Sequence, residues 1–323
     1  MGDVTTINHR CAVLGKPIAH SLSPVLHNAA YCALGLDDWR YDKYEVGQDD
    51  LAAFLDGLDP SWAGLSLTMP LKKTIQPYGR PCNLWARVLG VANTAVFDWS
   101  QSEGGGVPRI SLFNTDVIGI QLAFEHALRQ AGIVTSDHRS QRAVIIGNGN
   151  TAASAVAACT MMPQIGHVTV VARHPQRNPS LQPLAERFIP GVQVCDVIAM
   201  DDEAAVVGEL SRADRVVSTI PGLAGDGVAA MLGDVPSLKA GASLLDVVYD
   251  PRPTKLMSAW RAHGGLAIGG EEMLLYQALV QVLLMTGEWD GDPPSDWQAR
   301  LGDAATDDDA LEIAMRKALE EAL

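Results

Sequence analysis

The chain of 323 residues is 47% hydrophobic and 19% charged, which excludes a largely disordered protein and favours two packed domains over one. Its formal net charge of -14 excludes a general nucleic-acid-binding surface, because phosphate binding needs a concentrated positive field. No apolar stretch reaches the roughly twenty residues of a membrane helix, and residues 1–10 are too polar for a signal peptide. We therefore expect a cytoplasmic protein.

The first 116 residues alternate strand-like and helix-like segments. Strands are predicted at 11–15, 41–46 and 62–68, and a helix-like segment follows each of them, at 24–34, at 51–58 and from Pro70. This alternation is typical of an α/β domain with a mostly parallel sheet. The runs at 92–99 and 109–113, separated by a Gly-rich loop, predict a hairpin that closes the domain.

A helix at 117–131 leads into a second unit. Strands are predicted near 142–146, 167–171, 192–197, 214–219, 243–247 and 266–268, alternating with helices in a Rossmann-type order. Residues 271–287 form a helix that is apolar nearly all round, so we expect it to be buried and to pack back on the first domain. A loop and a solvent-facing amphipathic helix follow from Asp290. The predicted domains are residues 1–116 with 270–323, and residues 117–269.

The five cysteines, Cys11, Cys32, Cys82, Cys159 and Cys195, lie far apart and form no Cys-x-x-Cys pair. Since a cytoplasmic compartment keeps thiols reduced, we expect neither a disulfide nor a metal site at these residues.

The segment AVIIGNGNTAA, residues 143–153, runs from a strand through a glycine turn into a helix of small residues. Gly147 allows the chain to turn sharply, Gly149 lets the backbone approach a pyrophosphate, and Ala152 allows close packing of helix on strand. A turn in an unrelated α/β domain can give the same short pattern, but the strand that follows favours a dinucleotide site. The predicted contacts are Gly147, Asn148, Gly149, Asn150, Thr151 and Ala152.

The end of the next strand favours NADP over NAD. An NAD site usually has an acidic residue there to hold the ribose hydroxyl, and none is present. Arg173, His174 and Arg177 stand in that place, and a guanidinium fork suits a 2′-phosphate.

Four polar segments precede the glycine turn: PIAHSLSP (17–24), SLTMPLKK (66–73), ANT (92–94) and FNTD (113–116). Together with DVVYDP (246–251) and GGEEMLLYQA (269–278), they resemble the shikimate dehydrogenase family in motif and in order. The resemblance implies reversible NADP-linked reduction of 3-dehydroshikimate to shikimate. It also implies an N-terminal α/β substrate domain completed by a C-terminal helix, a Rossmann-type NADP-binding domain, and an active site in the cleft between them.

The resemblance also implies residue roles. Lys72 and Asp116 match the catalytic pair, and a Lys beside an Asp can move the proton that must accompany a hydride. Which of the two carries that proton stays open. The implied substrate ligands are Ser21, Ser23, Ser66, Thr68, Asn93, Tyr249 and Gln277, with the two serines on the substrate carboxylate. Further cofactor contacts are implied at Thr219, Val247 and Gly270.

The chain departs from the family pattern at four places. Val117 replaces the usual glycine after N-T-D, and A-R-H at 172–174 replaces N-R-T. Ser66 replaces an asparagine, and Asn150 is a bulky third residue of the phosphate turn. Two alternatives stay open: an NAD-using quinate/shikimate dehydrogenase of catabolism, and a non-catalytic nucleotide-sensing relative. We expect a monomer or a homodimer that binds a small-molecule substrate.

Overall fold

The computed structural model describes residues 6–103, 106–134, 140–188, 195–289 and 310–323. The chain forms two compact units, residues 1–115 with 277–323 and residues 116–276. Asp116 and residues 270–276 therefore group with the second unit, whereas the sequence placed them with the first. Gly270 has no room for a side chain because a Cβ there would lie 2.2 Å from the carbonyl oxygen of Val247. Tyr276 stacks at a tilt on His126, with ring centroids 5.8 Å apart.

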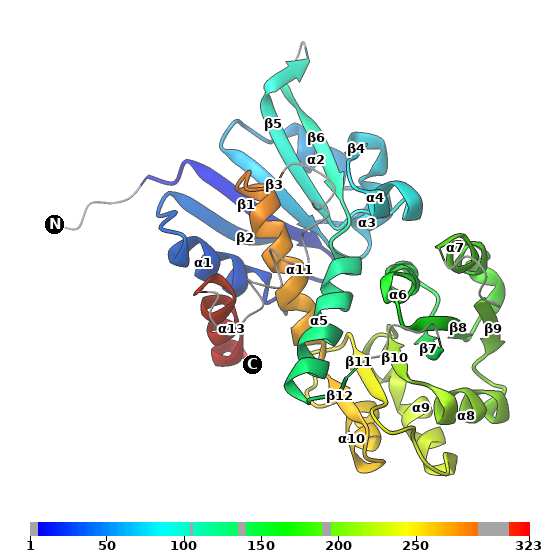
Figure 1. Ribbon diagram of the computed structural model, residues 1–323. Coiled ribbons are helices and arrows are strands. Elements are labelled where there is room, and N and C mark those ends of the chain that lie inside the picture. The colour runs from blue at the N-terminus through cyan, green and yellow to red at the C-terminus, as the bar shows by residue number, and fades with distance from the viewer. Residues whose placement is uncertain (1–5, 104–105, 135–139, 189–194, 290–309) are drawn as a thin grey trace. The chain divides into compact units, whose positions relative to one another are not determined.

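The first unit is built on a six-stranded sheet in the order β2-β1-β3-β5-β6-β4. Its strands are β1 (His9–Gly15), β2 (Trp39–Glu45), β3 (Trp62–Leu67), β4 (Arg80–Pro81), β5 (Thr94–Glu103) and β6 (Val107–Phe113). The pairs β1·β2, β1·β3 and β4·β6 are parallel, while the predicted hairpin β5–β6 introduces antiparallel pairs at β3·β5 and β5·β6. The hairpin projects beyond the rest of the sheet (Figure 1).

Successive side chains of a strand point to opposite sides of the sheet. Both faces of this sheet are covered by helices. Ala12 and Leu14 of β1 face a core that they share with α2 (Leu51–Asp56) and α3 (Leu71–Thr74). The opposite face receives α11 (Gly270–Met285), which crosses the sheet at β3 (Figure 1). A Cβ at Gly64 would lie 2.7 Å from Cγ of Met285, so a glycine at this position lets the helix approach the sheet closely.

The last described helix, α13 (Ala310–Ala322), packs against α1 (Ser23–Ala33) (Figure 1). Its Met315 and Leu319 are 0% and 3% exposed. The amphipathic helix expected to face solvent thus buries its apolar stripe in the first unit and leaves its polar face outside. The loop expected at residues 290–309 lies outside the described residues.

Two short elements of the first unit were not predicted, β4 and α4 (Leu84–Leu89). Helix α4 begins where Asn83 Oδ1 accepts the Ala86 amide at 3.0 Å and ends at Gly90, whose φ of 59° is left-handed. The predicted helix from Pro70 is only the four-residue α3, followed by the 3₁₀ turn η1 (Gln76–Tyr78). Pro77 limits it, because a proline has no amide hydrogen to donate to the carbonyl of Lys73, four residues before it.

The second unit alternates strands and helices along the chain. Its elements are α5 (Asp116–Gln130), β7 (Gln141–Ile146), α6 (Asn150–Met161), β8 (Ile165–Ala172), η2 (Pro175–Arg177), α7 (Leu181–Phe188), β9 (Cys195–Ala199), α8 (Glu203–Arg212), β10 (Arg215–Ser218), η3 (Gly222–Gly225), α9 (Asp226–Met231), η4 (Leu232–Asp234), β11 (Ser243–Asp246), α10 (Lys255–Ala262) and β12 (Leu266–Ile268). The first part of the strand predicted at 192–197 falls on residues outside the described ranges. Among the described helices, none is long and apolar enough to cross a membrane.

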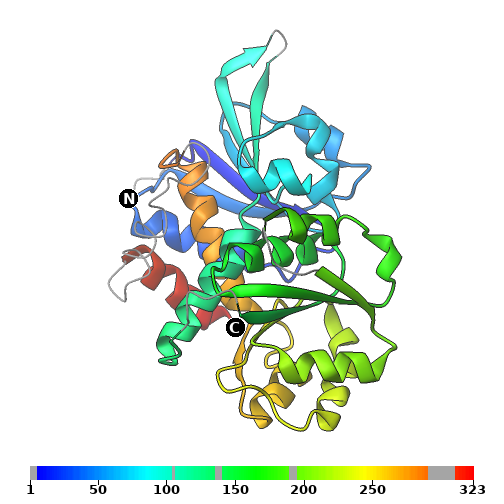
Figure 2. The ribbon, with the colours of Figure 1, turned by 45° about the vertical axis from the view of Figure 1, so that its right-hand side comes forward.

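All pairs in the second sheet are parallel, in the order β12-β11-β10-β7-β8-β9. Counted from β7, this is the strand order of a Rossmann fold, in which the chain reverses direction across the sheet between β7 and β10. Helices α5, α6 and α7 pack on one face, while α8, α9 and α10 enclose a core on the other (Figure 2). Trp260 of α10 is fully buried in that core. The predicted α/β architecture with a Rossmann-type unit is confirmed.

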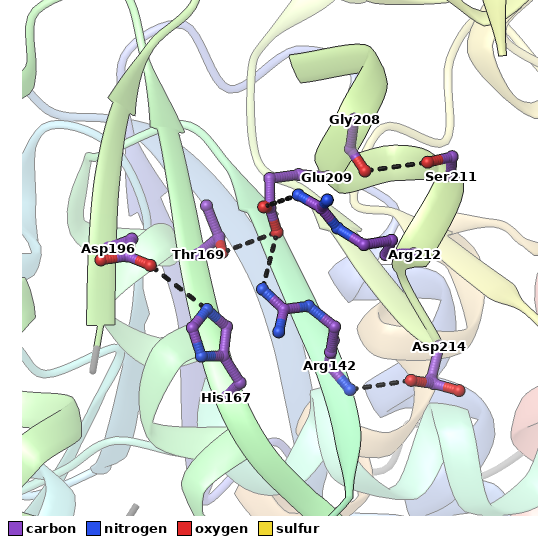
Figure 3. A network of polar contacts seen from close by, with 9 residues as sticks. All are labelled: Arg142, His167, Thr169, Asp196, Gly208, Glu209, Ser211, Arg212 and Asp214. Atoms are coloured by element: carbon purple, nitrogen blue, oxygen red, sulfur yellow. Dashed lines mark hydrogen bonds and ion pairs between the residues drawn. The ribbon is translucent and has the colours of Figure 1, made fainter. Parts of the chain in front are cut away.

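A polar network joins α8 to the strands of this sheet (Figure 3). Glu209 of α8 accepts hydrogen bonds from Arg142 of β7 at 3.2 Å, Thr169 of β8 at 3.1 Å and Arg212 at 2.5 Å. Burial alone would raise the pKa of Glu209, but the hydrogen bonds from Arg212 and Arg142 outweigh it and hold that pKa below its usual value. The carboxylate therefore stays ionised and anchors the helix.

Candidate active site

Asn93 lies at the centre of a buried polar cluster at the start of β5. Its Oδ1 accepts hydrogen bonds from the Thr115 amide at 2.8 Å and from Thr94 Oγ1 at 3.0 Å. Its Nδ2 donates to Thr115 Oγ1 at 2.9 Å and to Gln277 Oε1 at 3.3 Å. An asparagine amide has two donors and accepts at one oxygen, so the orientation of this one is determined by its neighbours. The structure brings two of the predicted ligands, Asn93 and Gln277, together in the first unit.

Ser66 is only 4% exposed and takes part in the same cluster from β3. Its hydroxyl accepts from Tyr41 at 2.5 Å and donates to Gln281 Oε1 at 2.9 Å. Because its one hydrogen is directed at Gln281, Ser66 can offer a ligand only a lone pair. Its role as a substrate ligand stays a prediction.

The paired serines lie at the entry to α1. Ser21 Oγ accepts the Ser23 amide at 3.4 Å, so its own hydrogen can still be donated to a carboxylate. Ser23 begins the helix and is 5% exposed. Its carbonyl accepts a hydrogen bond from Nδ1 of His27 at 2.9 Å, one helical turn later. Burial lowers the pKa of His27 to about 4, so this imidazole is neutral near pH 7.

Within the first unit, residues 92 and 93 hold the backbone of Lys72 and of Thr115, the residue before Asp116. The Lys72 carbonyl accepts the Ala92 amide at 2.9 Å. Thr115, held to Asn93, is followed directly by Asp116, which is the first residue of α5 and is 3% exposed. Thr68 is held four residues before Lys72, where its amide donates to the Leu14 carbonyl at 2.9 Å. These backbone bonds order the segments of the first unit that include Thr68, Lys72 and Thr115. The catalytic roles of Lys72 and Asp116 stay predictions.

The turn after β11 carries Tyr249. Asp246, at the end of that strand, accepts hydrogen bonds from Thr254 Oγ1 at 2.7 Å and from the Val248 amide at 3.4 Å, which orders the turn. Burial, with a smaller contribution from the charge of Asp250, raises the pKa of Tyr249. Its phenol therefore keeps its proton near neutral pH and can donate a hydrogen bond.

The glycine turn after β7 has the geometry that a phosphate needs. Gly147 has a φ of 116°, and a Cβ there would lie 2.4 Å from Thr219 Oγ1, so only glycine fits. Gly149 precedes α6 as its N-cap and provides no side-chain cap for the helix. The amides at the start of α6, from Asn150 to Ala152, can therefore receive a phosphate and the helix dipole favours it.

The predicted 2′-phosphate residues follow β8 beside this turn. Asn148 Nδ2 donates to the His174 carbonyl at 2.7 Å, which joins the glycine turn to the segment after β8. Asn178 Nδ2 donates to the Asn148 carbonyl at 3.3 Å. Arg173, His174 and Arg177 are exposed, so their side chains are accessible to a ligand. The residues present therefore fit a dinucleotide.

Sequence reasoning missed four residues that organise Asn93: Tyr41, Thr94, Thr115 and Gln281. Thr94 and Thr115 stand next to predicted residues, inside the ANT and FNTD segments. Gln281 follows Gln277 by one helical turn on a helix that is otherwise almost wholly apolar. A buried amide on such a helix needs hydrogen-bond partners, and that signal could have identified it.

Known proteins with similar sequences and folds were identified. The family model described as the shikimate dehydrogenase substrate binding domain matches residues 13–95. A relative named shikimate dehydrogenase (NADP(+)), from Moorella thermoacetica, is 33% identical over 85% of this chain and 87% of its own length. The crystal structure of shikimate dehydrogenase from Mycobacterium tuberculosis is 33% identical, with a TM-score of 0.75 over 97% of this chain and 99% of that one.

A third match is a structure from Thermus thermophilus in complex with NADP(H) and shikimate. It is 25% identical, with a TM-score of 0.67 over 96% of this chain and 99% of that chain. The matches in sequence and in fold extend over most of the chain and include both units. The chain belongs to the shikimate dehydrogenase family.

Proposed function

We propose that this protein catalyses the reversible, NADP-dependent reduction of 3-dehydroshikimate to shikimate, a step of aromatic amino-acid biosynthesis. The observation that carries the proposal is the 33% identity to a shikimate dehydrogenase (NADP(+)) over 85% of the chain. Lys72 and Asp116 also stand in the segments SLTMPLKK and FNTD that resemble the family's motifs. A non-catalytic nucleotide sensor would need neither of these two charged groups.

The reaction couples a hydride to a proton. Bound NADP would supply the hydride chemistry at the alcohol carbon of shikimate, in either direction. The hydroxyl proton must leave with the hydride, and we assign its acceptor to the pair formed by Lys72 and Asp116. The carboxylate orients the ammonium and the substrate hydroxyl, and the pair gives the proton back in the reducing direction.

The remaining predicted ligands orient the substrate ring. The hydroxyls of Ser21 and Ser23 bind the carboxylate, and Thr68, Asn93, Tyr249 and Gln277 bind ring hydroxyls. Ser66 can accept a hydrogen bond only, for the reason given above. Fixing the ring in this way converts the encounter into a unimolecular reaction between pre-positioned groups.

The cofactor is held by the second unit. Backbone amides from Asn148 to Ala152 receive the pyrophosphate, with Gly147 making the turn. Arg173, His174 and Arg177 bind the 2′-phosphate of NADP, and Thr219, Val247 and Gly270 complete the contacts. We therefore expect a much lower Michaelis constant for NADP than for NAD, and equal constants would refute the assignment of the two arginines.

A spectrophotometric assay tests the function directly. Wild-type protein with shikimate and NADP should give reduced nicotinamide absorbance, and quinate with NAD should give far less. Lys72→Ala and Asp116→Ala should each lower turnover by about 10²- to 10⁴-fold with little change in NADP affinity. Faster turnover with quinate and NAD would favour the catabolic alternative, and no turnover with either pair would favour a sensor.

Two coarser features belong to the same proposal. We assign the protein to the cytoplasm, where Cys11, Cys32, Cys82 and Cys159, which are free thiols, would stay reduced. We also assign it a monomeric or homodimeric state, which light scattering of the purified protein would measure. A stable tetramer would contradict that assignment.

A further inference from the structure

We propose that Gln281 is a positioning residue for substrate recognition, acting through a directed hydrogen-bond chain that presents the amide NH₂ of Asn93 to the substrate. The inference rests on the proposed function, since it concerns the residue assigned there to a ring hydroxyl. The chain runs from Tyr41 through Ser66, Gln281 and Thr94 to Asn93, and all five residues belong to the first unit.

The direction of each bond follows from one backbone carbonyl. The Asn93 carbonyl can only accept, so the group of Gln281 that lies 3.2 Å from it must be the donating Nε2. Gln281 Oε1 then faces Ser66, 2.9 Å away, and Ser66 must donate to it. Tyr41 must in turn donate to Ser66, because that hydroxyl has no second hydrogen.

The same carbonyl fixes the other branch. Gln281 Nε2 also donates to Thr94 Oγ1 at 3.0 Å, so Thr94 directs its own hydrogen to Asn93 Oδ1 at 3.0 Å. The Thr115 amide, which can only donate, reaches the same oxygen at 2.8 Å. The Thr94 hydroxyl and the Thr115 amide therefore both donate to Asn93 Oδ1. The NH₂ group of Asn93 is left to donate to Thr115 Oγ1 and Gln277 Oε1.

Burial makes this chain rigid. Tyr41 and Thr94 are fully buried, Gln281 is 1% exposed and Asn93 is 2% exposed, so water cannot replace a missing partner at low cost. A flipped Asn93 amide would place its NH₂ against the Thr115 amide and would be strongly disfavoured. The cluster is thus pre-organised in one polarity before a ligand arrives.

This polarity has a chemical consequence. An NH₂ group donates, so a ring hydroxyl bound by Asn93 must accept with its oxygen and direct its own hydrogen elsewhere. The bond from Asn93 to Gln277, at 3.3 Å, is the longest in the cluster and is the one that a ligand oxygen can replace most easily. Gln281 touches no ligand in this scheme and acts only by holding the donor in place.

A double-mutant cycle tests the proposal. We expect Gln281→Met to raise the Michaelis constant for shikimate about 3- to 10-fold, the loss that one buried hydrogen bond accounts for, while the constant for NADP stays unchanged. In an Asn93→Ala background, Gln281→Met should change the Michaelis constant for shikimate less than about 2-fold, because the residue that Gln281 positions is gone. Equal effects in both backgrounds would show a merely structural role and overturn the proposal.

Two further variants support the cycle. Gln121 of α5 is also a buried glutamine, 2% exposed, but it takes no part in the hydrogen bonds from Tyr41 to Asn93. Gln121→Met should therefore leave the Michaelis constants for shikimate and NADP unchanged. Tyr41→Phe removes only the terminal hydroxyl and gives the same test if Gln281→Met does not fold. If Gln281→Met or Tyr41→Phe folds and its Michaelis constant for shikimate is unchanged, the inference alone is overturned. An inactive wild-type protein would overturn the proposed function as well.

Discussion

Replacing His27 by leucine should remove part of the protein's sensitivity to acid. His27 is completely buried in α1, where its Nδ1 donates to the Ser23 carbonyl and its ring stacks on Tyr41 with centroids 3.9 Å apart. No partner for its Nε2 is present in the described residues. A protonated ring would therefore carry a buried charge beside an unpaired nitrogen, and burial lowers its pKa from 6.5 to about 4.

The magnitude follows from the difference between the two pKa values. The unfolded chain takes up this proton at a higher pH than the folded protein, so the contribution to stability is complete above pH 6.5 and is lost as the pH falls. At 1.36 kcal/mol per unit, a shift of this size corresponds to about 3 kcal/mol in total, of which about 2 kcal/mol is lost by pH 5. The loss ends once the pH has fallen below about 4.

Urea unfolding at pH 8, 7, 6 and 5 measures this effect. Acidic residues titrate in both proteins, so the quantity to compare is the loss of unfolding free energy between pH 8 and pH 5. Wild type should lose about 2 kcal/mol more than His27→Leu over that range. His20→Asn, which removes an exposed imidazole, should follow the wild type. Parallel curves for wild type and His27→Leu would refute the reasoning.

Three other substitutions test the packing described above. Glu209→Gln should lower the unfolding free energy at pH 7 by about 1–3 kcal/mol, and the difference should shrink in acid as the wild-type carboxylate protonates below its usual pKa; a constant difference down to pH 3 would contradict this. Gly147→Ala should lower stability by about 1–3 kcal/mol and weaken NADP binding in a fluorescence titration, because of its φ of 116° and the nearby Thr219 hydroxyl. Leu319→Ala should cost about 2–4 kcal/mol in chemical unfolding if α13 is part of the folded first unit, and no change would argue against that packing.

The sequence predicted those features whose cause is local. Gly147 could be placed in a strand-to-helix turn because its neighbours are an apolar run and a stretch of small residues. The strand and helix periods of both units were recognisable for the same reason. Helix α4 was missed because its six residues are too few to show a period, although Asn83 and Gly90 at its ends are good capping residues.

The arrangement around Asn93 could not be predicted from local pattern. Its partners Thr94 and Thr115 are close in sequence to predicted residues, but Gln281 lies 187 residues from Thr94. The sequence around Ser66 does not indicate that its hydroxyl will form hydrogen bonds with a tyrosine and a glutamine. Such contacts depend on the register of the sheet and on where α11 crosses it, and both are properties of the folded unit.

The hydrogen bond between Ser66 and Gln281 joins positions 215 residues apart. This separation limits the order in which the two units can fold during synthesis on the ribosome. Residues 116–276 are continuous, so the second unit can fold as soon as they emerge, while the first unit must wait for the C-terminal segment. Until then, the face of β3 that includes Gly64 lacks its covering helix. We expect nascent chains that end before Gln277 to bind chaperones through this uncovered sheet, and release to coincide with the arrival of Met285.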